Sequence, residues 1–180
     1  MLVRFTRLAG PRYRVDVVRE FDPPACMNVA PGFDEFLPHD LVHFLVEREF
    51  GVRLGIFGQL AAGGDAGTFW CAPADRNARL AQRAHRLLIT GRGDLGRSER
   101  LAAACFAAWE TKRGRRRAGA QWPAQVLHDT VAASPAEIAR VVDVFDEVAE
   151  KWHALDPGQS LAFEWPPALT LRRTARLRSA

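Results

Sequence analysis

Residues 2–20, LVRFTRLAGPRYRVDVVRE, alternate apolar and polar side chains on either side of a short interruption. Alternation with a period of two is typical of strands that bury one face. The interruption, residues 8–11, contains a glycine and a proline, which favour a turn. The segment therefore predicts an N-terminal β-hairpin with strands over residues 2–7 and 12–20.

A second alternating stretch lies near the other end of the chain. Residues 161–165 alternate in the same way, and Pro166 and Pro167 end the stretch. Because a single strand is not stable by itself, we expect this strand to pair with the N-terminal hairpin. A short third strand is expected near residues 25–29.

Between these strands, apolar residues recur at helical spacing. We expect helices over residues 39–50, 75–90, 98–111 and 134–152, with a short helix over 122–131. Ser98 and Ser134 are predicted to cap the helices that follow them, and Ser134 forms a capping box with Glu137. The predicted fold class is α+β: a small antiparallel sheet, made of the N-terminal hairpin and the C-terminal strand, packed against a mainly helical body.

Length and composition indicate one domain. With 180 residues, 48% of them hydrophobic, the chain can enclose one core, so we expect a single domain over residues 1–180. The longest apolar run, residues 101–109, is far shorter than the roughly 20 residues of a membrane-spanning helix. We therefore expect a cytoplasmic protein without membrane association. Its three cysteines are expected to be reduced and packed in the core: Cys26, Cys71 and Cys105.

Positive charge is concentrated in two short segments. The chain has 25 basic and 21 acidic residues, a net charge of +4. Nine of the basic residues lie in a basic loop over 112–120 and a basic C-terminal tail over 172–180, which leaves the rest of the chain with a net charge of −5. Those of the loop are Lys112, Arg113, Arg115, Arg116 and Arg117, and those of the tail are Arg172, Arg173, Arg176 and Arg178. Since a negative body repels phosphates, nucleic acid is a possible partner but not the favoured one.

The strongest functional signal is the segment HDLVHFLVE, residues 39–47. On a helix, His39, Asp40, His43 and Glu47 fall within an arc of about 100°. Burying such groups without partners costs several kcal/mol, so a shared metal ion or a proton-transfer site explains their clustering. The alternative interpretation is an exposed polar stripe.

This segment resembles the zinc-binding helix of zincin-type metalloproteases, whose pattern is His-Glu-x-x-His, with Asp40 in place of the glutamate. The resemblance covers five residues. It implies that His39 and His43 bind zinc and that Asp40 is the general base that activates the bound water. Because aspartate is one methylene shorter than glutamate, a site that binds metal without catalysis is an alternative. The chain is also similar to uncharacterised actinobacterial proteins that share a Pro-His-Asp-x-x-His start and a Gly-Gly-Asp-Ala-Gly turn, which implies no activity.

A tetrahedral zinc site with one open position needs a third protein ligand. Glu47 lies eight residues after His39, about 12 Å along a helix, which is too far for comfortable joint coordination. Three roles are open for Glu47: a ligand together with His43, a group that orients an imidazole, or the partner of a surface arginine. The other candidate ligands are Asp65 in a glycine-rich turn and His85, Glu99 and Glu110 on later helices.

Two functions of different classes follow. The first is a metal-binding protein, as a zinc-dependent hydrolase with zinc or another divalent metal as cofactor and an unidentified substrate. The second is a non-enzymatic interaction module whose Arg-rich loop and tail bind an acidic partner, either nucleic acid or protein. A third interpretation makes the histidine helix a packing element of a structural protein, with His39 as a cap and Glu47 in solvent.

Overall fold

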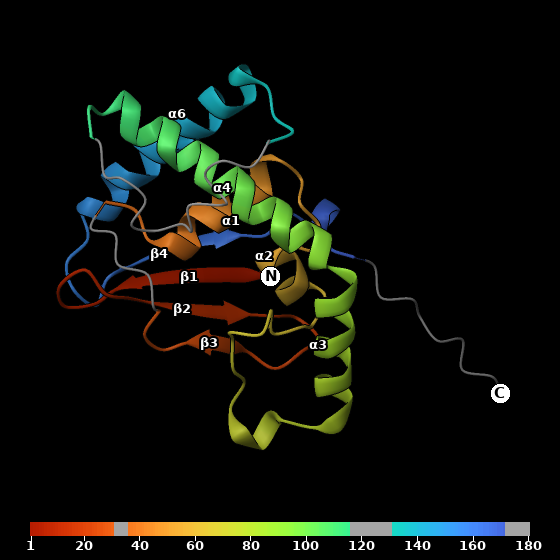
Figure 1. Ribbon diagram of the computed structural model, residues 1–180. Helices are drawn as coiled ribbons and strands as arrows, with labels where there is room; N and C mark the ends of the chain where they lie inside the picture. The colour runs from red at the N-terminus through yellow and green to blue at the C-terminus, as the bar shows by residue number, and fades with distance from the viewer. Residues whose placement is uncertain (31–35, 116–130, 172–180) are drawn as a thin grey trace.

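The computed structural model describes residues 1–30, 36–115 and 131–171. The fold is α+β, with a four-stranded antiparallel sheet in the order β3-β2-β1-β4 and helices beside it (Figure 1). The strands are β1 (Leu2–Arg7), β2 (Tyr13–Val18), β3 (Ala25–Met27) and β4 (Ser160–Glu164). The helices are α1 (His39–Glu49), α2 (Ile56–Ala61), α3 (Ala78–Thr90), α4 (Arg92–Lys112) and α6 (Pro135–His153). The predicted fold class is confirmed.

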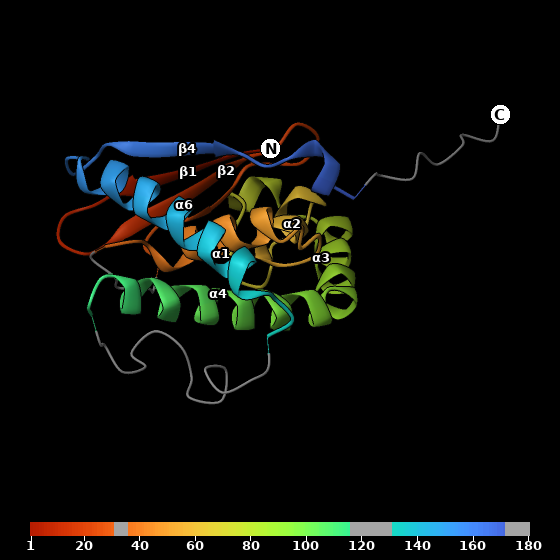
Figure 2. The ribbon, with the colours of Figure 1, turned by 90° about the horizontal axis from the view of Figure 1, so that it is seen from above.

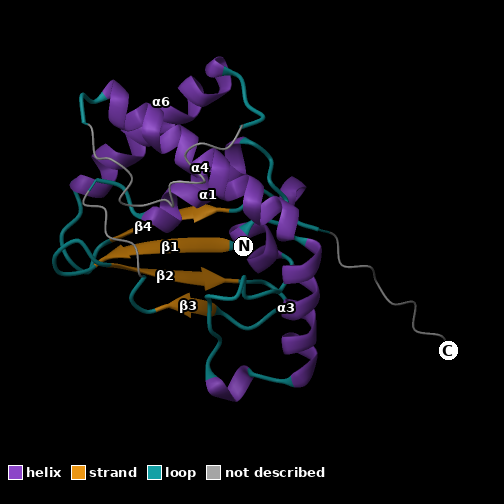
Figure 3. Ribbon diagram, viewed as in Figure 1, coloured by secondary structure: helices purple, strands orange, loops and turns teal. Residues whose placement is uncertain are grey.

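The N-terminal hairpin and the C-terminal strand share one sheet, as the alternation of apolar residues predicts (Figure 3). Leu2 of β1 pairs with Val18 of β2 on one side and with Glu164 of β4 on the other. The short third strand, β3, pairs with β2. The fully buried side chains of β1 and β2 are Val3, Phe5, Tyr13, Val15 and Val17.

Helix α1 lies at the centre of the fold. Figure 2 shows it between the sheet and α4, and it also contacts α2 and α6. The ring centroid of Phe44 in α1 lies 6.0 Å from that of Phe5, 5.1 Å from Phe57 and 5.5 Å from Phe163. Because α1 is covered on more than one side, all of residues 40–47 are buried.

Side-chain caps determine where α3 and α6 begin. Asn77 accepts a hydrogen bond of 3.0 Å from the amide of Leu80, so α3 begins at Ala78 and not at residue 75 as predicted. At the start of α6, Ser134 accepts from the amide of Glu137, whose carboxylate accepts from the amide of Ser134. This confirms the predicted capping box. Nearly all of the predicted helix over 122–131 lies outside the described residues.

The start of α4 differs most from the prediction. The helix begins at Arg92, six residues before Ser98, and only Gly91 separates it from α3. A Cβ atom at Gly91 would lie 2.6 Å from the carbonyl oxygen of Leu54, so this turn requires glycine. Asp94 in the first turn of α4 accepts a hydrogen bond of 2.8 Å from the amide of Leu54. The prediction that Ser98 caps a helix is therefore wrong, because Ser98 lies inside α4.

Two further predictions concern the packing of the cysteines and membrane-spanning helices. None of the three cysteines is disulfide bonded, but only Cys105 is buried, whereas Cys26 and Cys71 are partly exposed. The prediction that all three pack in the core is therefore right for Cys105 alone. Within the described part of the chain, no helix combines the length and the apolar character needed to cross a membrane.

Candidate functional site

Of the four ionisable residues predicted to cluster on α1, Asp40, His43 and Glu47 are buried and His39 is partly buried. Pro38 precedes the helix, and Gly51, with φ +64°, follows its end. His43 and Glu47 have no exposed surface, and Asp40 is 6% exposed. The interpretation of an exposed polar stripe is therefore wrong, as is that of a solvated Glu47, because the sheet and α4 cover α1 from two sides.

The two imidazole rings of α1 meet. The Nε2 atoms of His39 and His43 are 3.2 Å apart, and the ring centroids are separated by 4.7 Å with the planes at 69°. Residues four apart on a helix lie on the same face, which brings these side chains together. Glu99, from α4, places Oε2 3.6 Å from Nε2 of His43, and its side chain is 43% exposed. Of the candidate third ligands, Glu99 is thus brought next to the histidine pair.

A chain of hydrogen bonds lies behind His43. Its Nδ1 atom is 2.9 Å from Oγ of Ser98, and that hydroxyl donates to Oε1 of Glu47 at 2.8 Å. The same Oε1 accepts from the amide of Ile56 at 2.7 Å, and Oε2 accepts from the amide of Phe57 at 2.9 Å. Glu47 is therefore joined to His43 through Ser98, in the arrangement of a group that orients an imidazole, and it also caps the first turn of α2.

The carboxylate of Glu47 reaches α2 because residue 55 is glycine. A Cβ atom at Gly55 would overlap both oxygens and the carboxyl carbon of Glu47. Gly55 has φ −67°, a value that other residues adopt without strain. Its lack of a side chain is thus needed for the close approach of the carboxylate, not for the backbone conformation.

Asp40, the predicted general base, is hydrogen bonded to Tyr13 of β2. The hydroxyl of Tyr13 donates to Oδ2 of Asp40 and accepts from the amide of Asp40 at 3.2 Å. Burial raises the pKa of Asp40, and the hydrogen bond from Tyr13 opposes that rise. These contacts join the first turn of α1 to the sheet.

Two other candidate ligands, Asp65 and His85, lie in a turn and on the surface of α3, respectively. Oδ1 of Asp65 accepts a hydrogen bond of 2.9 Å from the amide of Gly67, so the carboxylate closes its own turn. Asp65 also lines a hollow of about 260 Å³ together with Arg19 and Trp70. His85 is exposed on α3.

The described part of the basic loop is engaged within the protein. Lys112 lies 2.8 Å from carboxylate oxygens of both Asp143 and Asp146 on α6. Arg113 lies 3.1 Å from Asp146, and the guanidinium of Arg115 lies over the ring of Phe36. Arg116, Arg117 and the tail over 172–180 lie outside the described residues.

Burial shifts the pKa values of the groups on α1. Burial, together with the nearby His39, lowers the pKa of His43 well below its usual value. Burial also lowers the pKa of His39, an effect that the charge of Asp40 opposes. Desolvation raises the pKa of Glu47 to about 7, against the effect of its hydrogen bonds. Both imidazoles are therefore favoured in the neutral form that binds metals.

The lowered pKa of His43 predicts a specific loss of stability in acid. Below about pH 6.5 the unfolded chain takes up a proton at this residue that the folded chain does not, so the free energy of unfolding falls, with a slope that approaches about 1.4 kcal/mol per pH unit well below that pH. A His43→Asn variant keeps a donor toward Ser98 but does not titrate in this range. We expect the difference in unfolding free energy between the two proteins, measured by urea denaturation, to fall by about 1 kcal/mol from pH 6.5 to 5.5.

The raised pKa of Glu47 has the opposite effect. Between its usual value and about 7, the folded chain holds the extra proton, so stability falls as the pH rises. This effect is common to the protein and to His43→Asn and cancels from their difference. A difference that stays constant from pH 6.5 to 5.5 would contradict the prediction.

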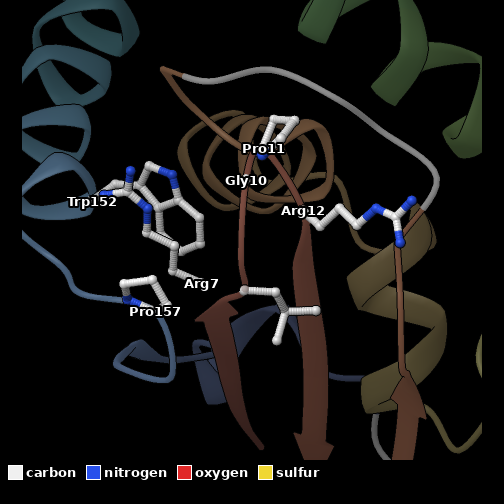
Figure 4. A pocket seen from close by; sticks show the side chains of 7 residues that line it. Arg7, Gly10, Pro11, Arg12, Trp152 and Pro157 are labelled. Atoms are coloured by element: carbon white, nitrogen blue, oxygen red, sulfur yellow. The ribbon is translucent and has the colours of Figure 1, made fainter.

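A separate hollow of about 350 Å³ lies beside the turn between β1 and β2 (Figure 4). In Figure 4 the side chains of Arg7 and Trp152 lie together, whereas that of Arg12 extends away from them. Arg7 donates to the carbonyl oxygens of His153 at 3.1 Å and Leu155 at 2.8 Å. Its guanidinium thus joins the hairpin to the end of α6, and the described lining includes none of the predicted site residues.

The arrangement of ligating side chains among the described residues falls short of a complete metal site. Within residues 1–30, 36–115 and 131–171, no group of three or more histidine, cysteine, aspartate or glutamate side chains is arranged to hold a metal ion. The histidine pair supplies two nitrogens, and the carboxylate of Glu99 approaches one of them.

No family model, curated protein or solved structure matches the chain.

Proposed function

We propose that this protein binds a divalent metal ion, zinc first among them, through Nε2 of His39 and His43 with the carboxylate of Glu99 as third ligand. The observation that carries the proposal is the 3.2 Å separation of the two Nε2 atoms. Two nitrogens that each lie 2.0–2.1 Å from a tetrahedral zinc ion are about 3.3 Å apart. The spacing of the histidine pair thus suits shared coordination without rearrangement of α1.

Glu99 requires a change of rotamer. Its Oε2 atom lies 3.6 Å from Nε2 of His43, and 43% of its side-chain surface is exposed. A side chain with that exposure turns at low cost compared with a buried one, because it does not displace core atoms. Three protein ligands would leave the fourth position of a tetrahedral ion for water.

Hydrolysis is the reaction class that the resemblance to zincins implies. A zinc ion held by His39 and His43 would supply a water whose pKa is lowered to about 7. Asp40, the acid that corresponds to the zincin base, is tied to Tyr13, so in our proposal it holds the first turn of α1 against the sheet. Of the three proposed ligands, Glu99 has 43% of its side-chain surface exposed, whereas His43 is fully buried.

The alternative of an interaction module has less support. Of the five basic residues of the loop, Lys112 and Arg113 are paired with carboxylates of α6, and Arg115 lies on Phe36. Releasing them for an acidic partner costs these contacts. We therefore favour metal binding.

Metal titration tests the proposal directly. The chain is stripped with a chelator and titrated with Co²⁺, whose visible absorption reports coordination, and with Zn²⁺ by calorimetry. We expect one ion per chain. His39→Ala should lower the affinity by more than the roughly 10–100-fold that loss of an outer hydrogen-bond partner causes. Because His39 is only partly buried, this variant is expected to fold, as checked by circular dichroism.

His85→Ala is the matched control, since it removes an exposed histidine from α3. It should bind as the unmodified protein does. Absence of stoichiometric binding to the unmodified protein, or equal affinities of His39→Ala and His85→Ala, would overturn the proposal.

A further inference from the structure

We infer that Ser98 and Glu47 act as positioning residues that hold His43 in its Nδ1-protonated tautomer, so that the Nε2 lone pair is directed at the metal site. This inference rests on the proposed function for the identity of the ligand. The arrangement of the hydrogen bonds is independent of it.

The direction of the chain of hydrogen bonds is fixed at Glu47. Backbone amides only donate, and those of Ile56 and Phe57 point at Oε1 and Oε2 respectively. Both oxygens of the ionised Glu47 are therefore acceptors. The hydroxyl of Ser98, 2.8 Å from Oε1, gives its single proton to that carboxylate.

The tautomer of His43 follows. Once Ser98 donates to Glu47, its oxygen has only lone pairs to offer to Nδ1 of His43 at 2.9 Å. Nδ1 must then carry the proton, and in the neutral ring Nε2 carries a lone pair. His43 is fully buried, so its neutral form is favoured.

The lone pair points toward groups that suit a cation. In the metal-free chain this lone pair accepts a hydrogen bond of 3.2 Å from Nε2–H of His39, and Oε2 of Glu99 lies 3.6 Å from the same Nε2 of His43. A lone pair beside a carboxylate oxygen is stabilised by a positive charge placed between them. Without the contact to Ser98, the ring can carry its proton on Nε2, which blocks coordination until the proton is lost.

The test measures the tautomer and the affinity separately. Nitrogen-15 NMR of the imidazole rings in metal-free protein distinguishes a protonated from an unprotonated Nδ1. We expect His43 to be protonated at Nδ1 in the unmodified protein, and to lose this preference in Ser98→Ala. The same variant should bind Zn²⁺ about 10–100-fold more weakly. Cys105→Ala truncates another buried side chain of α4 and should change neither result.

The outcomes distinguish this inference from the proposed function. A His43 ring protonated at Nε2 in the unmodified protein would overturn the inference, and so would a Ser98→Ala variant that keeps both the tautomer and the affinity. Should Ser98→Ala fail to fold, the tautomer of the unmodified protein and of Ser98→Thr, which keeps the hydroxyl, decides the matter. If the unmodified protein binds no Zn²⁺, the proposed function fails, whereas the NMR result still supports or overturns the assigned tautomer.

Discussion

A Gly55→Ala variant is expected to lose about 3–5 kcal/mol of unfolding free energy, a large part of the stability of a domain of this size. The added Cβ atom would overlap the carboxylate of Glu47, so that carboxylate must move away from the amides of Ile56 and Phe57. Because Glu47 is fully buried, its displaced charge has no access to water. Chemical denaturation of the purified variant measures the loss.

Gly93→Ala is the control for this prediction. Gly93 lies in α4 with open space where a Cβ atom would stand, so alanine should leave stability unchanged or raise it slightly through its higher helix propensity. The loss in Gly55→Ala should also shrink in a Glu47→Ala background, where the overlap no longer exists. Equal losses at Gly55 and Gly93, or strict additivity with Glu47→Ala, would contradict the explanation.

A Phe44→Ala variant is expected to lose about 3–5 kcal/mol. Phe44 is fully buried, and its ring contacts those of Phe5, Phe57 and Phe163 within centroid distances of 5.1–6.0 Å. Truncation leaves a cavity where α1, α2 and the sheet meet, and rigid neighbours from three elements close it poorly. Thermal and urea denaturation give the loss.

Ile89→Ala provides the comparison for Phe44→Ala. Ile89 is 65% exposed on α3, so its truncation should change the unfolding free energy by less than about 0.5 kcal/mol. A loss below about 1.5 kcal/mol for Phe44→Ala would contradict the prediction, because it would mean that the neighbouring side chains move to fill the cavity.

The sheet was predictable because its signal is local. The alternation in residues 2–20 and 161–165 fixes which side chains face the core, and only two segments of the chain carry it strongly. Pairing of the two ends followed from the need of a strand for a partner. The start of α4 was not predictable in this way, because three glycines in six residues, at positions 91, 93 and 96, are typical of a loop.

The sequence pattern around Ser98 also indicates a buried residue inside a helix, which competes with the interpretation of Ser98 as a helix cap. Ser98 precedes Leu101 by three residues and Cys105 by seven, so it continues the buried stripe of α4. A serine on an apolar stripe needs a hydrogen-bond partner inside the protein. Tyr13 carried a similar signal, as a hydroxyl on the buried face of a strand.

The candidate site was predictable only in part. The spacing of His39 and His43 puts the two rings on one face of a helix, and the structure brings their Nε2 atoms together. Which acid joins them depends on how α4 crosses α1, and no periodicity within one helix contains that information. Glu99 was therefore one candidate among several, and the attachment of Glu47 to α2 depends on a contact with Gly55 that only the folded chain reveals.

The pairing of β1 with β4 has a consequence for synthesis on the ribosome. Val3 of β1 lies opposite Phe163 of β4, so β1 gains its second neighbour only after about 160 further residues have emerged. Until then, Phe44 lacks the ring of Phe163 as a cover. The nascent chain therefore carries an open strand edge and an uncovered aromatic surface, which are the features that chaperones protect during translation.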